Sequence, residues 1–182
     1  MGRMYETPLC WGNRVSPQFR SFLRSSAARL GVEANYLMAC MAFETGRTFD
    51  PAIRNAAGSG AVGLIQFMPS TAAALGTTTE ALAALSAVQQ IKYVELYFRP
   101  WKSRLKSLSD VYMTILWPGA IGKPESYVLF DKADPKHPKR YIQNAGLDLD
   151  RNGQITKREA TDGVARMLTL GLRNGNVYED QN

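Results

Sequence analysis

Helix start and stop signals recur along this chain, and they limit the possible folds more than any other feature of the sequence. Ser16-Pro17 puts an N-cap serine before a proline at the first helical position, and Gly31 is a fitting end for that helix. A second helix is expected over about 32–45, because apolar residues recur there every three or four positions. A later helix is expected within 86–100, which opens with a Ser-x-x-Gln capping box and closes with a proline.

Apolar periodicity gives the first helix a buried face, which we expect to consist of Phe19, Phe22, Leu23 and Leu30. Alternation with period two is confined to the short run 127–130, so little β-sheet is expected. Shorter helices are expected near residues 70–75, 109–117, 138–144 and 157–170. The sequence therefore predicts a mainly α fold.

The length of 182 residues suits one domain with a sizeable core. We expect that core over 16–121, a proline-containing connector over 122–137, and a C-terminal helix-loop-helix over 138–175 that packs on the core. No run approaches the roughly 18 apolar residues of a membrane-spanning helix, so no membrane insertion is expected. The N-terminus has no apolar segment of the kind found in secretory signals. A monomer is expected.

The net charge of +6 suits a polyanionic partner such as nucleic acid, an anionic membrane or an acidic cell wall. The basic residues are scattered, however, and no nucleic-acid-binding motif organises them, so no nucleic acid partner is expected. A solvated, soluble surface accounts for most of this charge.

The two cysteines, Cys10 and Cys40, are too few for a disulfide scaffold and lack the spacing of a metal site. Cys40 falls in an apolar helical run, which favours a buried small hydrophobe. A bridge between the two cysteines stays open at this point.

Glu44 is the candidate catalytic residue, since it closes an apolar helix just before a glycine-rich loop. Cleavage of a glycoside needs a carboxylic acid that is still protonated near neutral pH. Two effects raise the pKa of a carboxyl in this place: the negative end of the helix dipole, and desolvation by apolar neighbours such as Met41 and Phe43. Against this stands the ordinary case, in which a glutamate at a helix end is solvated and has no chemical role.

The loop that follows is rich in glycine over 58–63, so its backbone can approach a ligand closely. Gln66 can bond sugar hydroxyls or acetamido groups, while Phe67 and Met68 can offer apolar surface to a pyranose ring. The alternative is that the apolar residues after the glycines belong to the core. For the pair Leu64-Ile65 we prefer the core.

These motifs resemble those of the lytic transglycosylase and goose-type lysozyme superfamily, which cleaves bacterial peptidoglycan. Glu44-Thr45 is similar to its Glu-Ser motif, and Gly-Leu-Ile-Gln-Phe-Met-Pro at 63–69 is similar to its Gly-Leu-Met-Gln-x-Met-Pro signature. The resemblance covers roughly 16–120 and implies a lysozyme-like domain with Glu44 as general acid/base. A third motif, Ala-Tyr-Asn-Ala-Gly, has its nearest counterpart in 112–120, which keeps Pro-Gly-Ala but lacks Tyr-Asn.

The family tyrosine that helps to position the glutamate therefore has no direct equivalent, and Tyr112 or Tyr93 can serve in its place. The resemblance implies a saccharide groove lined by the segment Gln66–Met68. The full set of candidate substrate-binding residues is Ser59, Gln66, Phe67, Met68, Tyr93 and Tyr112.

The type of reaction depends on a second carboxylate, which a hydrolase normally supplies. Asp50 is the nearest one after Glu44, but in Phe-Asp-Pro it favours a turn-forming role. We therefore expect a lytic transglycosylase that cuts the β-1,4 bond between N-acetylmuramic acid and N-acetylglucosamine and gives 1,6-anhydro products. A hydrolytic muramidase stays open, as does a non-catalytic wall-binding or phage structural protein.

The lack of a secretory signal, the compact size and the basic charge are expected of a phage endolysin or a secreted wall-degrading effector. Such a protein is made in the cytoplasm and acts in the periplasm or cell wall, after delivery by a phage or a secretion system.

A second motif, at 148–159, matches the twelve-residue EF-hand calcium loop. A glycine stands at its sixth position, where the chain must turn sharply, and an isoleucine at its eighth. There is one such loop, so we expect a structural Ca²⁺ in an EF-hand-like helix-loop-helix rather than a paired sensor. The expected ligands are Asp148, Asp150, Asn152, the backbone carbonyl of Gln154 and Glu159, with Thr156 acting through water.

Overall fold

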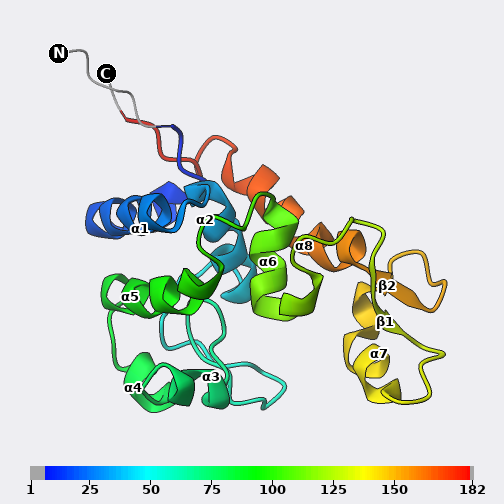
Figure 1. Ribbon diagram of the computed structural model, residues 1–182. Helices are drawn as coiled ribbons and strands as arrows, with labels where there is room; N and C mark the ends of the chain where they lie inside the picture. The colour runs from blue at the N-terminus through cyan, green and yellow to red at the C-terminus, as the bar shows by residue number, and fades with distance from the viewer. Residues whose placement is uncertain (1–6, 181–182) are drawn as a thin grey trace.

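The computed structural model describes residues 7–180, and its backbone is mainly α-helical, which confirms the predicted fold class (Figure 1). In chain order the elements are η1 (Gly12–Arg14), α1 (Pro17–Leu30), α2 (Ala34–Glu44), α3 (Pro69–Ala74), α4 (Thr79–Ala83), α5 (Ala87–Phe98), η2 (Arg99–Trp101), α6 (Leu108–Leu116), η3 (Pro118–Ala120), β1 (Val128–Asp131), α7 (Pro138–Asn144), η4 (Ala145–Leu147), β2 (Gln154–Thr156) and α8 (Lys157–Gly171).

Helix α1 begins and ends where the local signals place it. The Ser16 hydroxyl accepts a hydrogen bond from the Phe19 backbone N–H at 3.1 Å, and Gly31 closes the helix with a φ of 66°. Phe19, Leu23 and Leu30 of the predicted face are buried, and α1 packs against α5. The expected burial of Phe22 is wrong, because this side chain is 54% exposed at the edge of that face.

Helix α2 runs through the centre of the molecule. All residues from Leu37 to Ala42 are buried, and α1, α6 and α8 pack around them. Such a helix has no solvent-facing stripe, so neighbours are needed on every side. Gly163 lets α8 approach closely, because a Cβ at this position would lie 2.5 Å from Cε2 of Phe43. Helix α8 is thus part of the core.

The two ends of the described chain lie side by side (Figure 1). Leu9 and Tyr178 form an antiparallel bridge, with N–O distances of 2.9 and 3.0 Å. The buried Trp11 ring donates from Nε1 to the Met167 carbonyl of α8 at 2.8 Å. The first six residues, on which the expectation about secretory signals partly rests, lie outside the described region.

Strands β1 and β2 pair antiparallel, with Phe130 opposite Ile155. Directly after β2, the Lys157 side chain is fully buried, and its ammonium donates to the Asp110 carboxylate at 2.6 Å and to the Lys123 carbonyl at 2.8 Å. The C-terminal segment is therefore fastened to α6 by a buried ion pair as well as by apolar packing. The exact domain boundaries stay a prediction.

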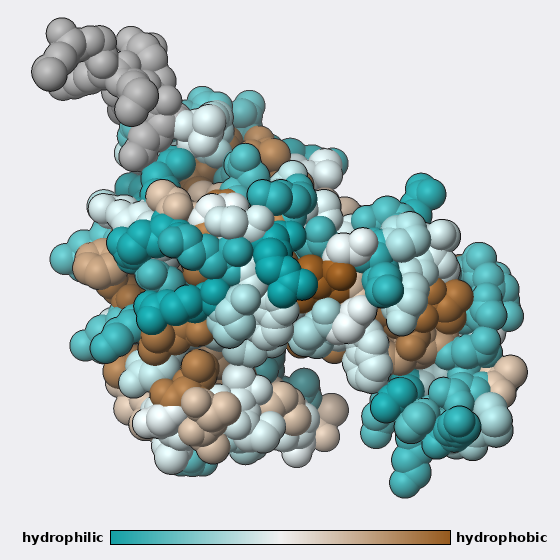
Figure 2. Space-filling model, viewed as in Figure 1, coloured by the Kyte–Doolittle hydropathy of each residue, from teal (hydrophilic) through white to brown (hydrophobic). Residues whose placement is uncertain are grey.

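The surface is notched between the lobe that carries α3 and α4 and the lobe that carries α7, with α6 above the notch in this view (Figure 2). Within residues 7–180, the helices are too short or too polar to cross a membrane.

Cys10 and Cys40 are both buried, and both thiols are free. The bridge that the sequence left open is not formed in this structure. Burial of Cys40 in α2 confirms its predicted role as a small hydrophobe.

Candidate active site

Glu44 is the last residue of α2, and the following threonine fixes the helix end. The hydroxyl of Thr45 donates to the Met41 carbonyl at 2.7 Å and accepts from the Phe49 backbone N–H at 2.9 Å. Thr45 is fully buried, whereas Glu44 keeps partial access to solvent. A carboxyl at the C-terminal end of an apolar helix is thus held next to the start of the loop.

Burial raises the pKa of Glu44 from an ordinary value of 4.5 to about 7. No hydrogen bond or ion pair within residues 7–180 involves its carboxylate, so no partner in this part of the chain offsets the desolvation. Glu44 is therefore a carboxylic acid that is half protonated near neutral pH. This is the state that a general acid needs.

Two tyrosines lie near enough to this carboxyl to be affected by its charge. Burial, and then the negative charge of Glu44, raise the pKa of Tyr97 to about 12 and the pKa of Tyr112 well above its ordinary range. Tyr112 also packs edge-on against Phe43, with ring centroids 5.6 Å apart. Of the two tyrosines named from the sequence, Tyr112 is thus the one that senses the charge of Glu44.

Sequence reasoning missed Tyr97. Its hydroxyl donates to the Thr114 carbonyl of α6, and its ring packs edge-on against Phe67 at 6.3 Å, so this one side chain joins α5, α6 and the loop. The available signal was its position one helical turn after Tyr93. Tyr93 itself lines a separate cavity of about 490 Å³ together with Phe22 of α1.

In the loop that follows Glu44, Ser59, Gln66 and Met68 keep access to solvent. Gln66 adopts a left-handed φ of 52°, and its Nε2 donates to the carbonyls of Ile53 at 3.3 Å and Gly63 at 3.1 Å. This leaves its Oε1 as the atom available to a ligand. Met68 is 43% exposed, and Ser59 is exposed with its hydroxyl accepting from the Ala61 N–H at 3.3 Å.

The remaining apolar residues of the loop are in the core. Leu64 and Ile65 are buried, which confirms the preference stated for them. Phe67 is also buried, at 1% exposure, so it supports Tyr97 from behind and does not present its ring face to solvent. Sequence reasoning also missed Gln90, a buried amide on α5 that holds the loop backbone.

Asp50 is exposed, and its Oδ1 accepts a hydrogen bond from the Ala52 backbone N–H at 2.8 Å. This two-residue contact is an Asx turn. The predicted turn-forming role of Asp50 is therefore confirmed.

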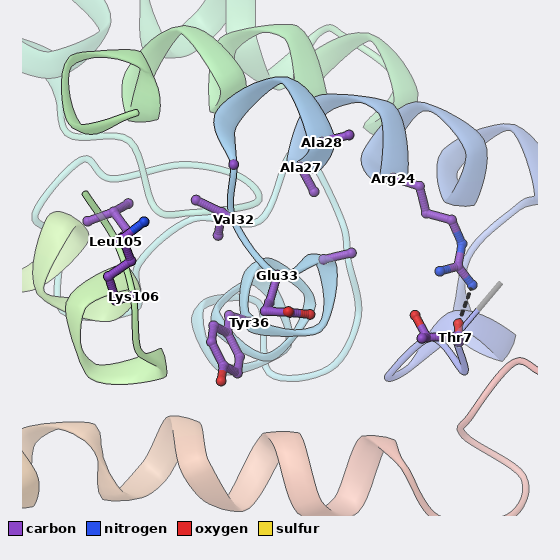
Figure 3. A pocket seen from close by; sticks show the side chains of 11 residues that line it. Thr7, Arg24, Ala27, Ala28, Val32, Glu33, Tyr36, Leu105 and Lys106 are labelled. Carbon is purple, nitrogen blue, oxygen red and sulfur yellow. Dashed lines mark hydrogen bonds between the residues drawn. The ribbon is translucent and has the colours of Figure 1, made fainter. Parts of the chain in front are cut away.

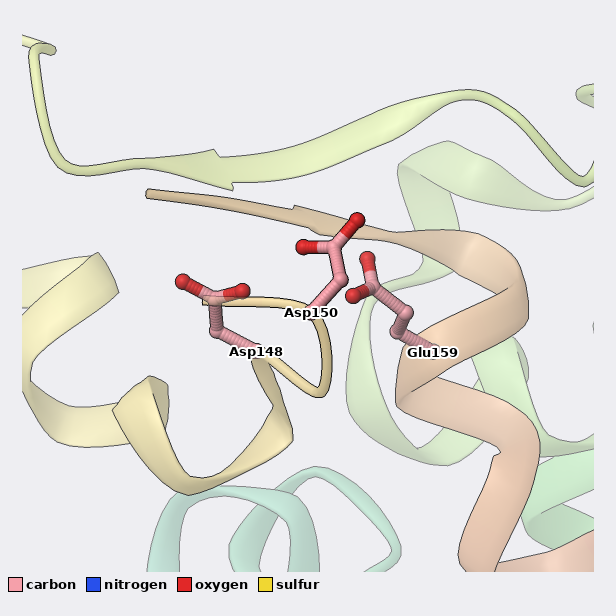
Figure 4. A group of neighbouring side chains, drawn as sticks. All are labelled: Asp148, Asp150 and Glu159. Carbon is pink, nitrogen blue, oxygen red and sulfur yellow. The ribbon is translucent and has the colours of Figure 1, made fainter. Parts of the chain in front are cut away.

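The candidate metal centre lies between the loop that follows η4 and the first turn of α8, where Asp148, Asp150 and Glu159 bring carboxylate oxygens within 4.8 Å of one another (Figure 4). Calcium binds oxygen at about 2.3–2.6 Å, so two oxygens on one ion lie at most about 5 Å apart. The three carboxylates fit that limit. Gly153 has a φ of 88°, as the sharp turn of such a loop requires.

Hydrogen bonds shape this loop from within. Asp148 accepts from the Tyr141 hydroxyl at 2.6 Å and from the Gly153 N–H at 2.9 Å, and these contacts hold its pKa below the ordinary value. Glu159 accepts from the backbone and hydroxyl of Thr156, forming the capping box of α8.

The other predicted ligands of the loop are also placed. The Asn152 side chain bonds Asp150 at 3.0 Å, while the Gln154 side chain bonds Asp131 at 2.9 Å, away from the carboxylates. The Gln154 side chain thus points away from the carboxylate cluster, and its backbone carbonyl as a ligand stays a prediction.

A cavity of about 480 Å³ lies at the opposite end of α2 (Figure 3). Glu33 and Tyr36 project into it between Lys106 on one side and Arg24 on the other, and Arg24 donates to the Thr7 carbonyl at 2.8 Å. An 11-residue helix is about 16 Å long, so this cavity is separated from the C-terminal end of α2. It is not the site of Glu44.

Comparison with known families gives a match over residues 21–106 to a model described as the transglycosylase SLT domain. The match spans just under half of the chain and includes Glu44, Gln66 and Tyr97, whereas Tyr112 and the candidate metal centre lie beyond it. Among curated proteins no match is found. Residues 21–106 are thus similar to a domain whose family members are lytic transglycosylases that act on peptidoglycan.

Proposed function

We propose that this protein cleaves the β-1,4 bond between N-acetylmuramic acid and N-acetylglucosamine in peptidoglycan, as a lytic transglycosylase. The observation that carries the proposal is the Glu44 carboxyl, with a pKa of about 7, in an environment that contains Tyr97 and Tyr112. The match to the transglycosylase SLT domain supports the same substrate class. The net charge of +6 suits an acidic wall polymer.

Glu44 donates its proton to the glycosidic oxygen while the bond from that oxygen to C1 of the muramyl ring breaks. The Glu44 carboxylate then accepts the proton of the muramyl C6 hydroxyl, while the C6 oxygen bonds to C1. Atoms and charges balance without water, and the product is a 1,6-anhydro ring. The glycan strand is bound beside the reacting bond by Oε1 of Gln66 and by the exposed side chain of Met68.

The 1,6-anhydro product is favoured over hydrolysis by the place of Asp50. Inverting and retaining hydrolases use a second carboxylate about 5 to 9.5 Å from the acid. Asp50, the nearest in sequence, is exposed and engaged in an Asx turn. A muramidase that activates water is the second candidate, and its products end in a reducing sugar.

We also propose that the 148–159 loop holds a structural Ca²⁺. Asp148, Asp150, Asn152, the Gln154 carbonyl and Glu159 would be its ligands, and the ion would neutralise the clustered carboxylates between α7 and α8. Strand β2 of this loop has its partner β1 within the same chain. This supports a monomer, because no second loop is needed to pair with it.

A bacterial cell wall is the proposed place of action, reached by phage-borne or secreted delivery. The proposed class of protein is accordingly an endolysin or a wall-degrading effector. A protein that binds the wall without cleaving it is the remaining alternative.

The test is mass spectrometry of the soluble muropeptides released from purified peptidoglycan by the parent protein and by Glu44→Gln. Anhydro products from the parent alone support the transglycosylase. Reducing-end products support the muramidase. If a folded, calcium-loaded parent releases nothing, the enzyme proposal is overturned and a binding protein remains.

A further inference from the structure

Gln90 is a fully buried amide on α5 whose three hydrogen bonds all go to backbone outside its own helix. Its Oε1 accepts from the Leu64 N–H at 2.8 Å. Its Nε2 donates to the carbonyls of Pro51 at 3.0 Å and Leu82 at 2.9 Å. One side chain thus joins the two ends of the loop that precedes α3 and also fixes the end of α4.

Gly63 is shaped to fit this amide. A Cβ at Gly63 would lie 2.4 Å from Oε1 of Gln90 and 2.8 Å from the Pro51 carbonyl, and its φ of 79° favours glycine. The Gly63 N–H donates to the Ile53 carbonyl at 2.9 Å, which closes the same turn. The loop backbone can therefore pack directly against Gln90 only because this residue has no side chain.

The residues that follow Gly63 carry the candidate saccharide contacts. Val62 and Phe67 exchange two backbone hydrogen bonds at 3.1 and 2.8 Å, enclosing Gln66 in its left-handed conformation. A non-glycine residue with positive φ persists only where its surroundings over-determine it. Gln90 supplies part of that constraint, because it binds Leu64 inside this turn.

We infer that Gln90 is a positioning residue for the glycan-binding loop. It does not touch the reacting atoms, and it acts by holding the 51–67 backbone in the shape that presents Gln66 and Met68 to the strand. This inference rests on the proposed function for its effect on substrate, but its effect on the loop can be measured without any substrate. A buried apolar residue in its place would leave the Leu64 N–H and the Pro51 carbonyl without partners, while the Leu82 carbonyl keeps the Leu85 N–H, and the loop would rearrange to hydrate the two orphaned groups.

The experiment compares Gln90→Met with Val94→Ala, a cavity-forming change at a buried residue of the same helix that has no polar contact with the loop. Amide hydrogen exchange is followed residue by residue in the full chain, with calcium present. In Gln90→Met, the Leu64 and Phe67 amides should exchange at least about tenfold faster than in the parent, while α2 amides keep their protection. In Val94→Ala, any change in amide exchange rates should reflect only the change in the global free energy of unfolding.

The kinetic readout uses solubilised, uncrosslinked peptidoglycan strands. Gln90→Met should raise KM about tenfold or more and leave kcat within a few-fold of the parent, since Glu44 is untouched. Val94→Ala should leave KM unchanged. Gln90→Glu keeps the acceptor for Leu64 but changes the donor side, and it serves if the methionine variant fails to fold. Its KM should lie between the values of the parent and of Gln90→Met.

Unchanged protection of Leu64 and Phe67 in both Gln90 variants would overturn the inference. So would a loss of protection spread evenly over the molecule and equal to that in Val94→Ala. If the parent cleaves nothing but the exchange pattern is as expected, the positioning role of Gln90 on the loop stands and the proposed reaction does not.

Discussion

Nζ of Lys157 lies 2.6 Å from Oδ1 of Asp110, in a buried ion pair that joins the first turn of α8 to the first turn of α6. Burial acts to raise the pKa of Asp110, but the Lys157 ammonium and the Gly122 N–H hold it below its ordinary value. Two residues after Asp110, α6 carries Tyr112, and α8 carries Gly163 against Phe43. The pair therefore fastens together two of the helices that pack on α2.

Removing one partner of this pair should destabilise the protein strongly. In Lys157→Met the Asp110 carboxylate would be left buried with only the backbone N–H groups of Gly122 and Lys106 as partners, and the free energy of unfolding should fall by about 3–5 kcal/mol. Urea denaturation at neutral pH measures this. The control is Arg166→Met, which removes an exposed α8 ion pair with Asp162 and should cost less than about 1 kcal/mol. Equal losses in the two variants would contradict the assignment of a special role to the buried pair.

Activity should fall as pH rises through about 7. The first step needs protonated Glu44, and above its pKa of about 7 the protonated fraction falls about tenfold for each pH unit. The pH profile of kcat/KM on solubilised glycan strands should therefore have a basic limb near pH 7. Glu44→Gln should reduce the rate by about 10²–10⁴-fold and abolish the limb. A basic limb that persists in the residual activity of Glu44→Gln would point to a different titrating group.

Glu44 should also make stability depend on pH. Its folded pKa of about 7 is above the unfolded value near 4.5, so the folded state binds this proton more tightly. The resulting stabilisation is fully present below about pH 4.5 and is lost as pH rises through 7, which amounts to at most about 3 kcal/mol. Glutamine does not titrate, so Glu44→Gln has no such pH-dependent loss. The free energy of unfolding of the variant should therefore rise relative to that of the parent between pH 5 and pH 8. Urea unfolding of both proteins across this range measures the difference, and parallel curves would show that Glu44 is not desolvated.

Calcium should stabilise the protein, and one exposed carboxylate should be needed for that effect. A ligand present at about 100 times its Kd raises the free energy of unfolding by about 2.7 kcal/mol. Asp150 is exposed, and within residues 7–180 its carboxylate accepts hydrogen bonds only from Asn152, so Asp150→Ala should remove the calcium response and change the metal-free stability little. Thermal unfolding with calcium and with excess chelator tests this. Glu125→Gln, another exposed carboxylate outside the loop, should keep the full response.

Much of the helical fold could be predicted because its signals are local. The cap at Ser16, the capping box at Ser86 and the Asx turn at Asp50 each need only three or four consecutive residues, and the structure has them all. Glu44 could be named for the same reason, since the end of its helix and its apolar neighbours are adjacent in sequence. The error at Phe22 arose because periodicity gives the direction of a face but not the width that its partner covers.

The parts that sequence reasoning missed depend on which helices meet. Tyr97 gains its role from Thr114 on α6, and Gln90 gains its role from backbone as distant in sequence as Pro51. Trp11 is buried only because α8 returns to cover it. Nothing in the neighbouring residues marks these three side chains as different from other aromatic or amide residues on a helix.

The packing of α2 against α8 also fixes when this molecule can fold. A ribosome releases Leu37–Ala42 more than a hundred residues before it releases Ala160 and Val164, and until then the side of α2 that α8 covers stays open. Contacts between such distant segments slow folding and leave apolar surface open to chaperones or to other nascent chains. Until α8 has been synthesised, a nascent chain therefore carries the apolar residues of α2 without one of the three helices that pack around them.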